Sequence, residues 1–529
     1  MTRFNQQSVN SRKTVNHAGA LAFTLTPELD LYSQVCTASL QPKYYDPSTQ
    51  NQLDRLRNTI AAVDPELVCK LAVYAREKMY LRSVPLVLMI ELLKNFNDGK
   101  QCGKRNPKTL KNSTYRIIQR ADEITEVLSY FIHANNRTAV KKLGKLPNTL
   151  KKAVANSFHK FDEYQLAKYN RDGAVKLRDA LFLTHSKPKD EKEQILFKKL
   201  IDNELTEPYT WEVEFSKLGQ QKFSSEDVKF KAFSNKWKEL VESNKLGYMA
   251  LLRNLRNILK YGASKDLVKV VCEKLSDPIA IAKSKQLPFR FWSAYLSLGF
   301  GSSRRIINSN DLNLDPFAIK ALQNSLEKAI KTSVDNLKGF DEDTRVLIAS
   351  DVSGSMQYSI SPKSQVQYYD VGLLLGQLLQ TKCKNVITGF FGDIWKVTEY
   401  AKDNVLDNTL NLYTREGEVG YSTNGYKVLQ WLNQRNIGLD KVMIFTDCQL
   451  WNSASGKASM HSEWQKYRNR YPTAKLYLFD LAGHGTSPLD IHTEKNVFLI
   501  SGWSEKIFEV MEAIENGGNV IDFIKNIQI

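Results

Sequence analysis

The sequence lacks the features that mark membrane, secreted and disulfide-stabilised proteins. No run of about eighteen apolar residues occurs, which excludes a membrane-spanning helix. The first residues, Met1 to Ser8, contain no apolar segment of the kind found in secretory signals, so we expect the protein in the cytoplasm. The six cysteines are scattered singly without a C-x-x-C pair, which argues against a disulfide framework and against a cysteine zinc site.

The motifs of common enzyme classes are also missing. The chain has no P-loop, no H-E-x-x-H motif and no pair of carboxylates at a credible catalytic spacing. Its seven histidines form no cluster that could serve a ribonuclease. A hydrolase elbow needs glycine two residues on either side of its serine, but Ser353 has Asp351 and Ser355 at those positions. We therefore expect a protein without enzymatic activity.

Positive charge is what the sequence has in excess, and it is concentrated in one region. The whole chain has a net charge of +17. Residues 1–340 carry 56 Lys and Arg against 35 Asp and Glu, whereas residues 341–529 carry 18 against 22. Residues 101–200 alone hold 22 basic and 10 acidic side chains. A generic solvated surface would also explain such an excess, but the asymmetry favours a polyanionic partner for the first region only.

Residues from about 50 to 330 show helical periodicity and no strand pattern. Asp64 and Pro65 have the typical form of an N-cap followed by proline at the first helical position. Helix follows helix with short polar breaks, which predicts an α-solenoid of packed helix pairs, although no fixed repeat period is visible. We expect the polar residues 1–45 to form an arm that packs onto another part of the protein. Other expected helices include Ala174–Leu183, Ser224–Asn244, Tyr248–Leu259 and Ala318–Lys331.

The pattern changes near Asp341, where short apolar strands begin to alternate with helical segments. An apolar helix, Val366–Gln380, lies between the first two strands. Such alternation predicts a mainly parallel sheet with helices on both faces, in the manner of Rossmann-like folds. We therefore expect a helical domain at residues 1–340 and an α/β domain at residues 341–529. The five expected strands are Arg345–Ser350, Asn385–Phe391, Lys441–Thr446, Lys475–Leu481 and Asn496–Ile500.

The most specific local motif follows the first expected strand. Asp351, Ser353 and Ser355 stand at alternate positions, so an extended turn would project their oxygens in one direction, as one hard cation requires. In open α/β sheets, ligands gather at the carboxyl ends of the strands. A later apolar strand also ends in a carboxylate, Asp447, and a glycine-flanked loop between the two offers the hydroxyl of Thr423.

These residues resemble the metal-ion-dependent adhesion site of a von Willebrand factor A domain, and the resemblance covers about residues 343–529. Such a site binds a divalent cation and leaves a coordination position open for an acidic group of a partner. We expect Mg²⁺, with Mn²⁺ or Ca²⁺ as alternatives. Ser422 is a rival to Thr423, Asp393 is expected to be a turn residue, and an empty, purely structural site is the alternative. The implied metal ligands are Asp351, Ser353, Ser355, Thr423 and Asp447, some of them acting through water.

Three stretches of the helical region carry a second resemblance. They are Tyr169–Pro188, Pro208–Glu212 and Leu246–Asn257. Together they resemble the TROVE module of the Ro autoantigen family, which is shared with telomerase- and vault-associated proteins. In Ro proteins this module is a ring of HEAT-like helical repeats, and a following von Willebrand A domain closes the ring. The same order and length here imply that fold for nearly the whole chain, in a bacterial or otherwise divergent member of the family.

The Ro resemblance implies RNA partners. Ro proteins bind small noncoding Y RNAs on the outer basic surface of the ring, and single-stranded 3′ ends of misfolded or decaying RNAs in the central channel. We expect a monomeric scaffold for RNA quality control or processing, with an exoribonuclease or another protein at the metal site. Arg253 and Arg256 either line the channel or brace neighbouring carbonyls. The Y-RNA-type contacts would come from Arg137, Lys141, Lys142, Lys145, Lys151, Lys152, Lys168, Arg171 and His185.

Other interpretations stand beside these. Tyr164, Tyr169 and His185 are candidates for base stacking, although His185 could simply cap a helix. We expect Arg178 and Asp179 to form a structural ion pair between helices. For the whole chain, the alternative function is a metal-dependent protein-interaction module such as a chelatase-type A-domain subunit. Such subunits typically carry acidic or proline-rich linkers before the A domain, and the segment before Asp343 is short and unremarkable.

Overall fold

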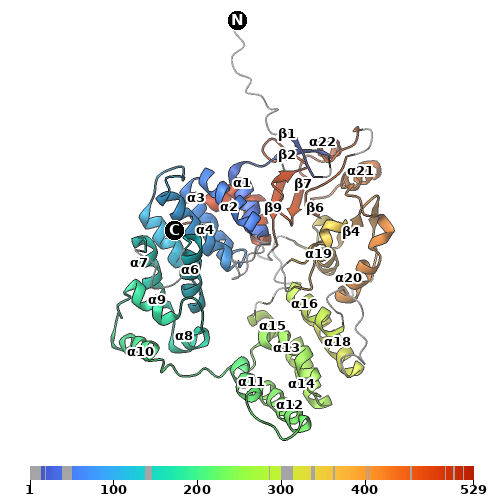
Figure 1. The fold of residues 1–529 in the computed structure, drawn as a ribbon. Helices are drawn as coiled ribbons and strands as arrows, with labels where there is room; N and C mark the ends of the chain where they lie inside the picture. Colours follow the sequence, from blue (N-terminus) through green and yellow to red (C-terminus); the bar gives the residue numbers. More distant parts are fainter. Residues whose placement is uncertain are drawn as a thin grey trace.

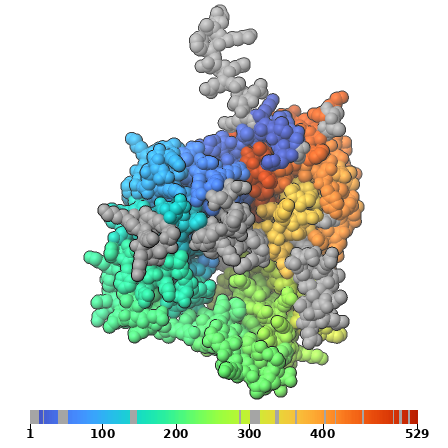
Figure 2. All heavy atoms as spheres, viewed as in Figure 1, coloured from blue at the N-terminus to red at the C-terminus, as the bar shows by residue number. Residues whose placement is uncertain are grey.

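Helices form most of a ring, and a β-sheet closes it (Figure 1). The computed structural model describes residues 13–17, 19–38, 50–136, 146–284, 286, 288–299, 314–334, 340–360, 364–400, 402, 404–452, 456–494, 496–503, 507–515 and 518–529. In the space-filling view, this face is hollowed between the teal helices and the yellow-green helices (Figure 2). None of the helices within those ranges is long and apolar enough to cross a membrane.

The helical region is a solenoid of packed helix pairs, as its periodicity predicted. Neighbouring pairs such as α3 with α4, α5 with α7, and α14 with α18 pack along their lengths. The helices are α1 (Pro27–Thr37), α2 (Gln50–Ala62), α3 (Pro65–Glu77), α4 (Ser83–Asn97), α5 (Pro107–Ile117), α6 (Ala121–Ala134), α7 (Asn148–Ser157), α8 (Glu163–Tyr169), α9 (Leu177–Thr184), α10 (Glu191–Asp202), α11 (Trp211–Gly219), α12 (Glu226–Glu242), α13 (Tyr248–Lys260), α14 (Lys265–Ser276), α15 (Pro278–Ser284), α16 (Pro288–Gly299) and α18 (Pro316–Ser333).

Capping residues fix where these helices begin. The Asp64 carboxylate accepts hydrogen bonds from the N–H groups of Glu66 (2.9 Å) and Leu67 (3.2 Å), which confirms the predicted N-cap of α3. Helix α9 starts three residues later than expected. The reason is a capping contact, since Asp179 in its first turn accepts a hydrogen bond from the backbone N–H of Lys176 (3.0 Å).

The α/β domain has the expected, mainly parallel sheet. Its strand order is β5-β4-β3-β6-β7-β9, and every neighbouring pair is parallel except β4 and β5. The five predicted strands are present, each within one residue of its expected bounds, whereas β5 was not predicted. The strands are β3 (Arg345–Asp351), β4 (Asn385–Phe391), β5 (Trp395–Val397), β6 (Lys441–Thr446), β7 (Lys475–Asp480) and β9 (Val497–Ser501).

Helices cover both faces of this sheet. Helix α19 (Tyr368–Lys382) packs on β3, β4 and β6, while α21 (Tyr426–Arg435) and α22 (Met460–Arg470) pack together over the other face. Two glycines of α19 let it approach closely, because a Cβ at Gly372 or Gly376 would collide with side chains of the strands beneath. Helix α20 (Val405–Thr414) packs against α19 and also against α18 of the helical region.

The N-terminal arm packs onto the α/β domain, through elements that the sequence did not predict. Strands β1 (Lys13–Val15) and β2 (Leu21–Thr24) form a hairpin that pairs with the short strand β8 (Thr486–Ser487). The side chain of Asn16 in the hairpin turn donates to the carbonyl of Leu450 (2.9 Å), and the Asn16 side chain is buried. Helix α1 follows and packs on β9.

Among the described residues, contacts at both ends of the helical region join it to the α/β domain and close the ring. At the first of these joints, α24 (Val520–Lys525), which follows α23 (Ile507–Glu515), packs on α3, and the Tyr74 and Phe523 rings meet edge to face at 6.1 Å. At the second, the Glu327 carboxylate of α18 accepts hydrogen bonds from the N–H groups of Val405 and Leu406 at the start of α20.

Candidate metal centre and nucleic-acid interface

Asp351 is the last residue of β3 and lies fully buried at the carboxyl edge of the sheet. One carboxylate oxygen accepts the backbone N–H of Ser353 (3.0 Å) and the other accepts the hydroxyl of Thr446 (2.8 Å). These bonds fix the carboxylate plane, because each oxygen has its own donor. The first of them also sets the turn that follows the strand, from which Ser353 and Ser355 project.

Asp447 follows the neighbouring strand β6 and brings a second buried carboxylate to the same edge. Burial, together with the negative charge of Asp447, raises the pKa of Asp351 to about 7. Two like charges in a buried site repel one another unless a cation lies between them. The pair is therefore a place where a divalent cation relieves an electrostatic cost.

Three hydroxyl groups complete the donor set. The Ser353 and Ser355 hydroxyl oxygens lie 3.3 Å apart. The Thr423 hydroxyl donates its hydrogen to the carbonyl of Gln449 (2.8 Å), which leaves its lone pairs available to a cation. The backbone N–H of Ser422, by contrast, donates to Asp393 (3.0 Å), which holds the loop as an ordinary turn residue would.

The structure thus brings the five predicted metal residues to one edge of the sheet. Two carboxylates and three hydroxyls are all oxygen donors, and hard divalent cations prefer oxygen. In the part of the chain that the structure describes, no group of three or more His, Cys, Asp or Glu side chains could hold a metal. A cation at this edge would therefore depend on the serine and threonine hydroxyls as well as on the carboxylates.

The N-terminal hairpin braces the loop that follows β6. Asn16 binds the carbonyl of Leu450, and the backbone N–H of His17 donates to the Gln449 side chain (2.8 Å). Gln449 in turn accepts the Thr423 hydroxyl and donates its N–H to Asp447 (3.0 Å). These bracing residues were missed, since nothing in the local sequence near Asn16 indicates a contact with a loop at the other end of the chain.

Of the nine predicted RNA-binding residues, four, Arg137, Lys141, Lys142 and Lys145, lie outside the described residues. Lys151 and Lys152 lie on α7, where Lys152 is exposed and Lys151 is half-buried. Helix α7 packs against α9, so these lysines are on the same part of the ring as the other predicted residues.

Aromatic and cationic side chains lie together at helix α8. The Lys168 ammonium is 5.8 Å from the ring centres of both Tyr164 and Tyr169, and Tyr164 is exposed. The guanidinium of Arg120, which the sequence did not single out, lies 4.4 Å from the Tyr169 ring centre. Flat rings beside cations are the groups on which unpaired bases stack.

Arg171 lines a polar hollow of about 460 Å³ between α8, α9 and α10, together with Arg178. The predicted ion pair between Arg178 and Asp179 is wrong. Side chains of adjacent helical residues do not face each other, and Asp179 caps α9 through Lys176 instead. Among the described residues, neither arginine forms an ion pair, because Asp172, the one acidic side chain that lines the hollow, pairs with Lys176 instead (2.6 Å).

His185 is the C-cap of α9 and has a left-handed backbone conformation with φ of 51°. Its side chain is exposed. The structure therefore agrees with the helix-capping interpretation, and the imidazole of His185 is exposed to solvent. His185 follows Arg178 by seven residues, so their backbones stand roughly 10 Å apart along the axis of α9.

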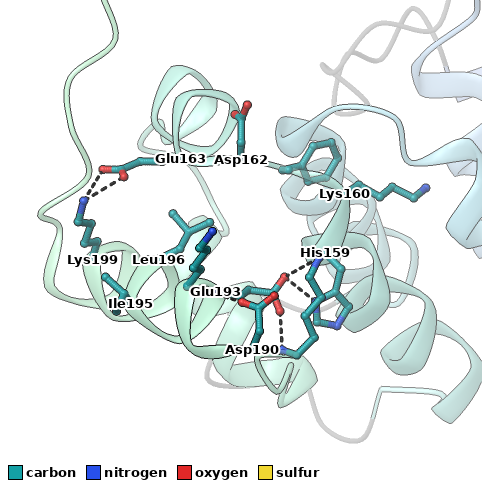
Figure 3. Close-up of a pocket in the computed structure, with 12 residues that line it drawn as sticks. His159, Lys160, Asp162, Glu163, Asp190, Glu193, Ile195, Leu196 and Lys199 are labelled. Carbon is teal, nitrogen blue, oxygen red and sulfur yellow. Dashed lines mark hydrogen bonds and ion pairs between the residues drawn. The ribbon is translucent and has the colours of Figure 1, made fainter.

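A second hollow nearby, of about 490 Å³, holds charges that are already paired (Figure 3). On one side, Nδ1 of His159 lies 2.8 Å from the Glu193 carboxylate. On the other side, hydrogen bonds from the backbone of Thr206 and from the Lys199 ammonium hold the pKa of Glu163 at about 2. Four lysines and four acidic side chains line this hollow, whereas three cationic side chains and one carboxylate line the hollow of Arg171, which therefore offers a phosphate more net positive charge.

Arg253 and Arg256 lie on the polar face of α13. Arg253 is exposed and Arg256 is half-buried. Within the described residues, no hydrogen bond joins either side chain to a carbonyl, and both interpretations of these arginines stay predictions.

Comparison with known families matches the two parts of the chain separately. The TROVE domain family matches residues 31–236 and 204–311. The family described as Ro60 vWA domain matches residues 345–514. The first match covers more than half of the chain, and the second includes all five residues of the candidate metal centre.

Similar proteins were found by sequence and by structure. Telomerase protein component 1 of Rattus norvegicus is 25% identical over 349 residues, and that of Mus musculus is 24% identical. The matches cover 51% of this chain but only 12% of those much longer proteins. The crystal structure of the Deinococcus radiodurans RO (RSR) protein has a TM-score of 0.60 at 17% identity, covering 93% of this chain and 100% of that one. At this identity the likeness shows a shared fold.

Proposed function

Because the chain joins a TROVE domain to a Ro60-type von Willebrand factor A domain, it belongs to the Ro family of RNA-binding proteins, and we propose that it binds small structured RNA of the Y type on its helical region. Single-stranded ends of misfolded or decaying RNA would enter the hollow of the ring. The protein would act without catalysis, as a scaffold in RNA quality control or processing. Family membership disfavours the chelatase-type alternative.

The observation that carries this proposal is the pair of unpartnered arginines in the polar hollow by α9. Arg171 and Arg178 can each form two parallel hydrogen bonds to a phosphate, which makes a guanidinium a strong phosphate ligand. Lys152 and the Tyr164–Lys168 group lie on neighbouring helices and extend the surface. The exposed Arg253 on α13 is the corresponding candidate for a single strand that enters the ring.

Salt dependence tests the proposal. We expect a small hairpin RNA to bind the full chain, with an affinity that falls by about 10³-fold or more between 50 and 200 mM salt if six or more phosphates are contacted. Fluorescence anisotropy across that range measures the slope. An affinity that does not change with salt would contradict a phosphate-dominated interface.

Charge reversal tests whether the RNA binds at the hollow lined by Arg171 and Arg178. Arg171→Glu combined with Arg178→Glu should weaken hairpin binding by more than about tenfold, because two phosphate contacts become repulsive. The control is Lys265→Glu combined with Lys269→Glu, which makes the same charge change at exposed positions of α14. Equal losses in both double variants would mean that net charge, and not this hollow, determines binding.

We also propose that Asp351, Ser353, Ser355, Thr423 and Asp447 hold a divalent cation, with Mg²⁺ as the first candidate. The fit rests on the all-oxygen donor set and on the mutual repulsion of the two buried carboxylates. A bound cation would supply an open coordination position for an acidic group of a protein partner such as an exoribonuclease. The chain's own part is to orient the hydroxyls and the two carboxylates, and the cation would favour the ionised form of both acids.

A further inference from the structure

Exposed apolar side chains of the α/β domain are concentrated around the candidate metal centre. Among the described residues from 340 onward, four large apolar side chains are exposed, each to between 47% and 71%. All four lie on loops that carry or adjoin the metal residues, and we call them the apolar collar. The collar consists of Tyr358, Ile394, Tyr421 and Trp451.

Each metal-site loop contributes to the collar. Tyr358 follows the loop of Ser353 and Ser355, Tyr421 precedes Thr423 by two residues, and Trp451 follows Asp447 by four. Ile394 lies in the turn between β4 and β5, beside the loop that contains Tyr421. The collar and the metal residues therefore share the same short segments of backbone.

Backbone hydrogen bonds hold these segments together. The N–H of Trp451 donates to the carbonyl of Thr423 (2.9 Å), which ties the Asp447 loop to the Thr423 loop. The N–H of Ile394 donates to the carbonyl of Val419 (3.2 Å), and Asn424 donates to Gly392 (3.1 Å). Three of the collar side chains thus project from one cross-linked platform, which needs little ordering when a partner binds.

The distribution of these side chains points to an interface. Single exposed apolar residues are ordinary, but here the exposed ones gather at one site, and three of the four are Tyr or Trp. Tyr and Trp are the residues that most often dominate the energy of protein interfaces, because they bury a large area at a small entropic cost.

We propose that the apolar collar and the metal centre together dock a partner protein, through a segment that carries an Asp or Glu side chain next to large apolar residues. The acidic side chain reaches the cation and its apolar neighbours pack on the collar. The inference rests on the proposed metal site. It adds the requirement for apolar neighbours, which the cation alone does not impose.

Charge favours a protein segment over RNA at this face. Residues 341–529 carry 18 basic and 22 acidic side chains, and the turn beside Ile394 and Tyr421 contains Asp393. RNA brings a negative charge with every nucleotide, whereas an acidic residue in an apolar segment brings one. The helical region, with its excess of 21 positive charges, is where the chain favours RNA.

A peptide selection on the full chain tests the proposal. Random twelve-residue peptides displayed on phage are selected in Mg²⁺, and the most enriched peptide is synthesised with a fluorescent label. We expect the enriched sequences to share an Asp or Glu beside aromatic or aliphatic residues. Binding should weaken at least about tenfold in EDTA, when the peptide acid is changed to its amide, and with Trp451→Ser or Tyr421→Ser.

Two controls distinguish peptide binding by the collar from an effect on the metal site and from non-specific apolar binding. Ile279→Ser removes a side chain that is 78% exposed on α15 and should leave peptide affinity unchanged. Mn²⁺ binding, followed by electron paramagnetic resonance, should be the same in Trp451→Ser as in the unaltered chain. If Mn²⁺ fails to bind the unaltered chain, the assignment of the metal site is wrong, and the docking proposal that rests on it is wrong as well.

Several results would overturn the docking proposal alone while Mn²⁺ still binds. They are enriched peptides without a shared acidic residue, peptide binding that survives EDTA, and full affinity in Trp451→Ser. Displacement of the peptide by an oligouridine RNA would assign the face to RNA instead. Self-association that disappears in Trp451→Ser would assign it to a second copy of the chain.

Discussion

The two buried carboxylates at the carboxyl edge of the sheet set the chemistry of that edge. Each oxygen of Asp351 has a hydrogen-bond donor, yet burial and the nearby charge of Asp447 still raise its pKa to about 7. Hydrogen bonds alone therefore do not offset the repulsion. A divalent cation would offset this repulsion. The stability of the domain should therefore report whether the metal site is occupied.

Asp351→Asn should stabilise the protein in chelator and abolish its response to Mg²⁺. The amide removes the repulsion with Asp447, but it also removes an ionic ligand. The unaltered chain should gain about 2.7 kcal/mol when Mg²⁺ is at one hundred times its dissociation constant. Thermal unfolding in EDTA and in Mg²⁺ measures both effects. Asp393→Asn, on the neighbouring loop, should keep the normal response, and a Mg²⁺ response that survives in Asp351→Asn would contradict the ligand assignment.

Sequence reasoning predicted the five candidate metal residues, which the structure brings to one edge of the sheet, but it misjudged other side chains whose surroundings are set by the fold. Asp351, Ser353 and Ser355 could be predicted because their spacing within one turn is itself the evidence. The pairing of Arg178 with Asp179 failed, because adjacency in a helix does not bring side chains together. Trp451 could not be recognised as exposed, because a single tryptophan in a sequence does not indicate whether its side chain is buried or on the surface.

At the scale of elements, the docking of helix α1 on the α/β domain depends on close backbone approach. Gly502 follows β9 with φ of 70°, and a Cβ there would collide with the backbone carbonyl of Cys36 in α1. The Ser33 hydroxyl of α1 also donates to the fully buried carboxylate of Asp480 (2.7 Å). The helix and the strand ends therefore fit without space for a methyl group.

Gly502→Ala should destabilise the protein much more than Gly456→Ala. Both glycines have positive φ, which costs an alanine about 1–2 kcal/mol. Only Gly502 has a neighbour within contact distance, so its substitution should lose about 3 kcal/mol or more in total. Urea unfolding followed by circular dichroism gives the free energy of unfolding of both variants. Equal losses of stability would show that α1 shifts to accommodate the added methyl group.

The elements that could be predicted are those whose signal is local. Buried parallel strands such as Lys441–Thr446 are continuous apolar runs, and the expected bounds agree with the structure. The hairpin of β1 and β2 could not be predicted, because its strands have three and four residues and pair with a two-residue strand near the other end of the chain. Its stability comes from that distant pairing and from Asn16.

At the scale of the whole molecule, the two proposed partners are assigned to different regions by charge. The helical region carries the positive excess and the α/β domain is slightly negative. RNA and a divalent cation should therefore leave separate footprints on one chain.

Hydrogen exchange measured by mass spectrometry should show this separation. A bound hairpin RNA should slow exchange in peptides from α7 to α10 and leave the loops at residues 351–355, 420–424 and 447–451 unchanged. Mg²⁺ should do the reverse, because it orders the loops that hold its ligands. Protection of the metal loops by RNA in the absence of Mg²⁺ would contradict the assignment of the two regions.

The first joint of the ring has a consequence for how the protein is made. Helix α3 near the beginning of the chain is covered by α24 near its end, and the Lys70 ammonium donates to the carbonyl of Lys525 (2.6 Å). A ribosome must therefore synthesise nearly all of the described chain before this contact can form. Until α24 has been synthesised, this joint cannot close the ring.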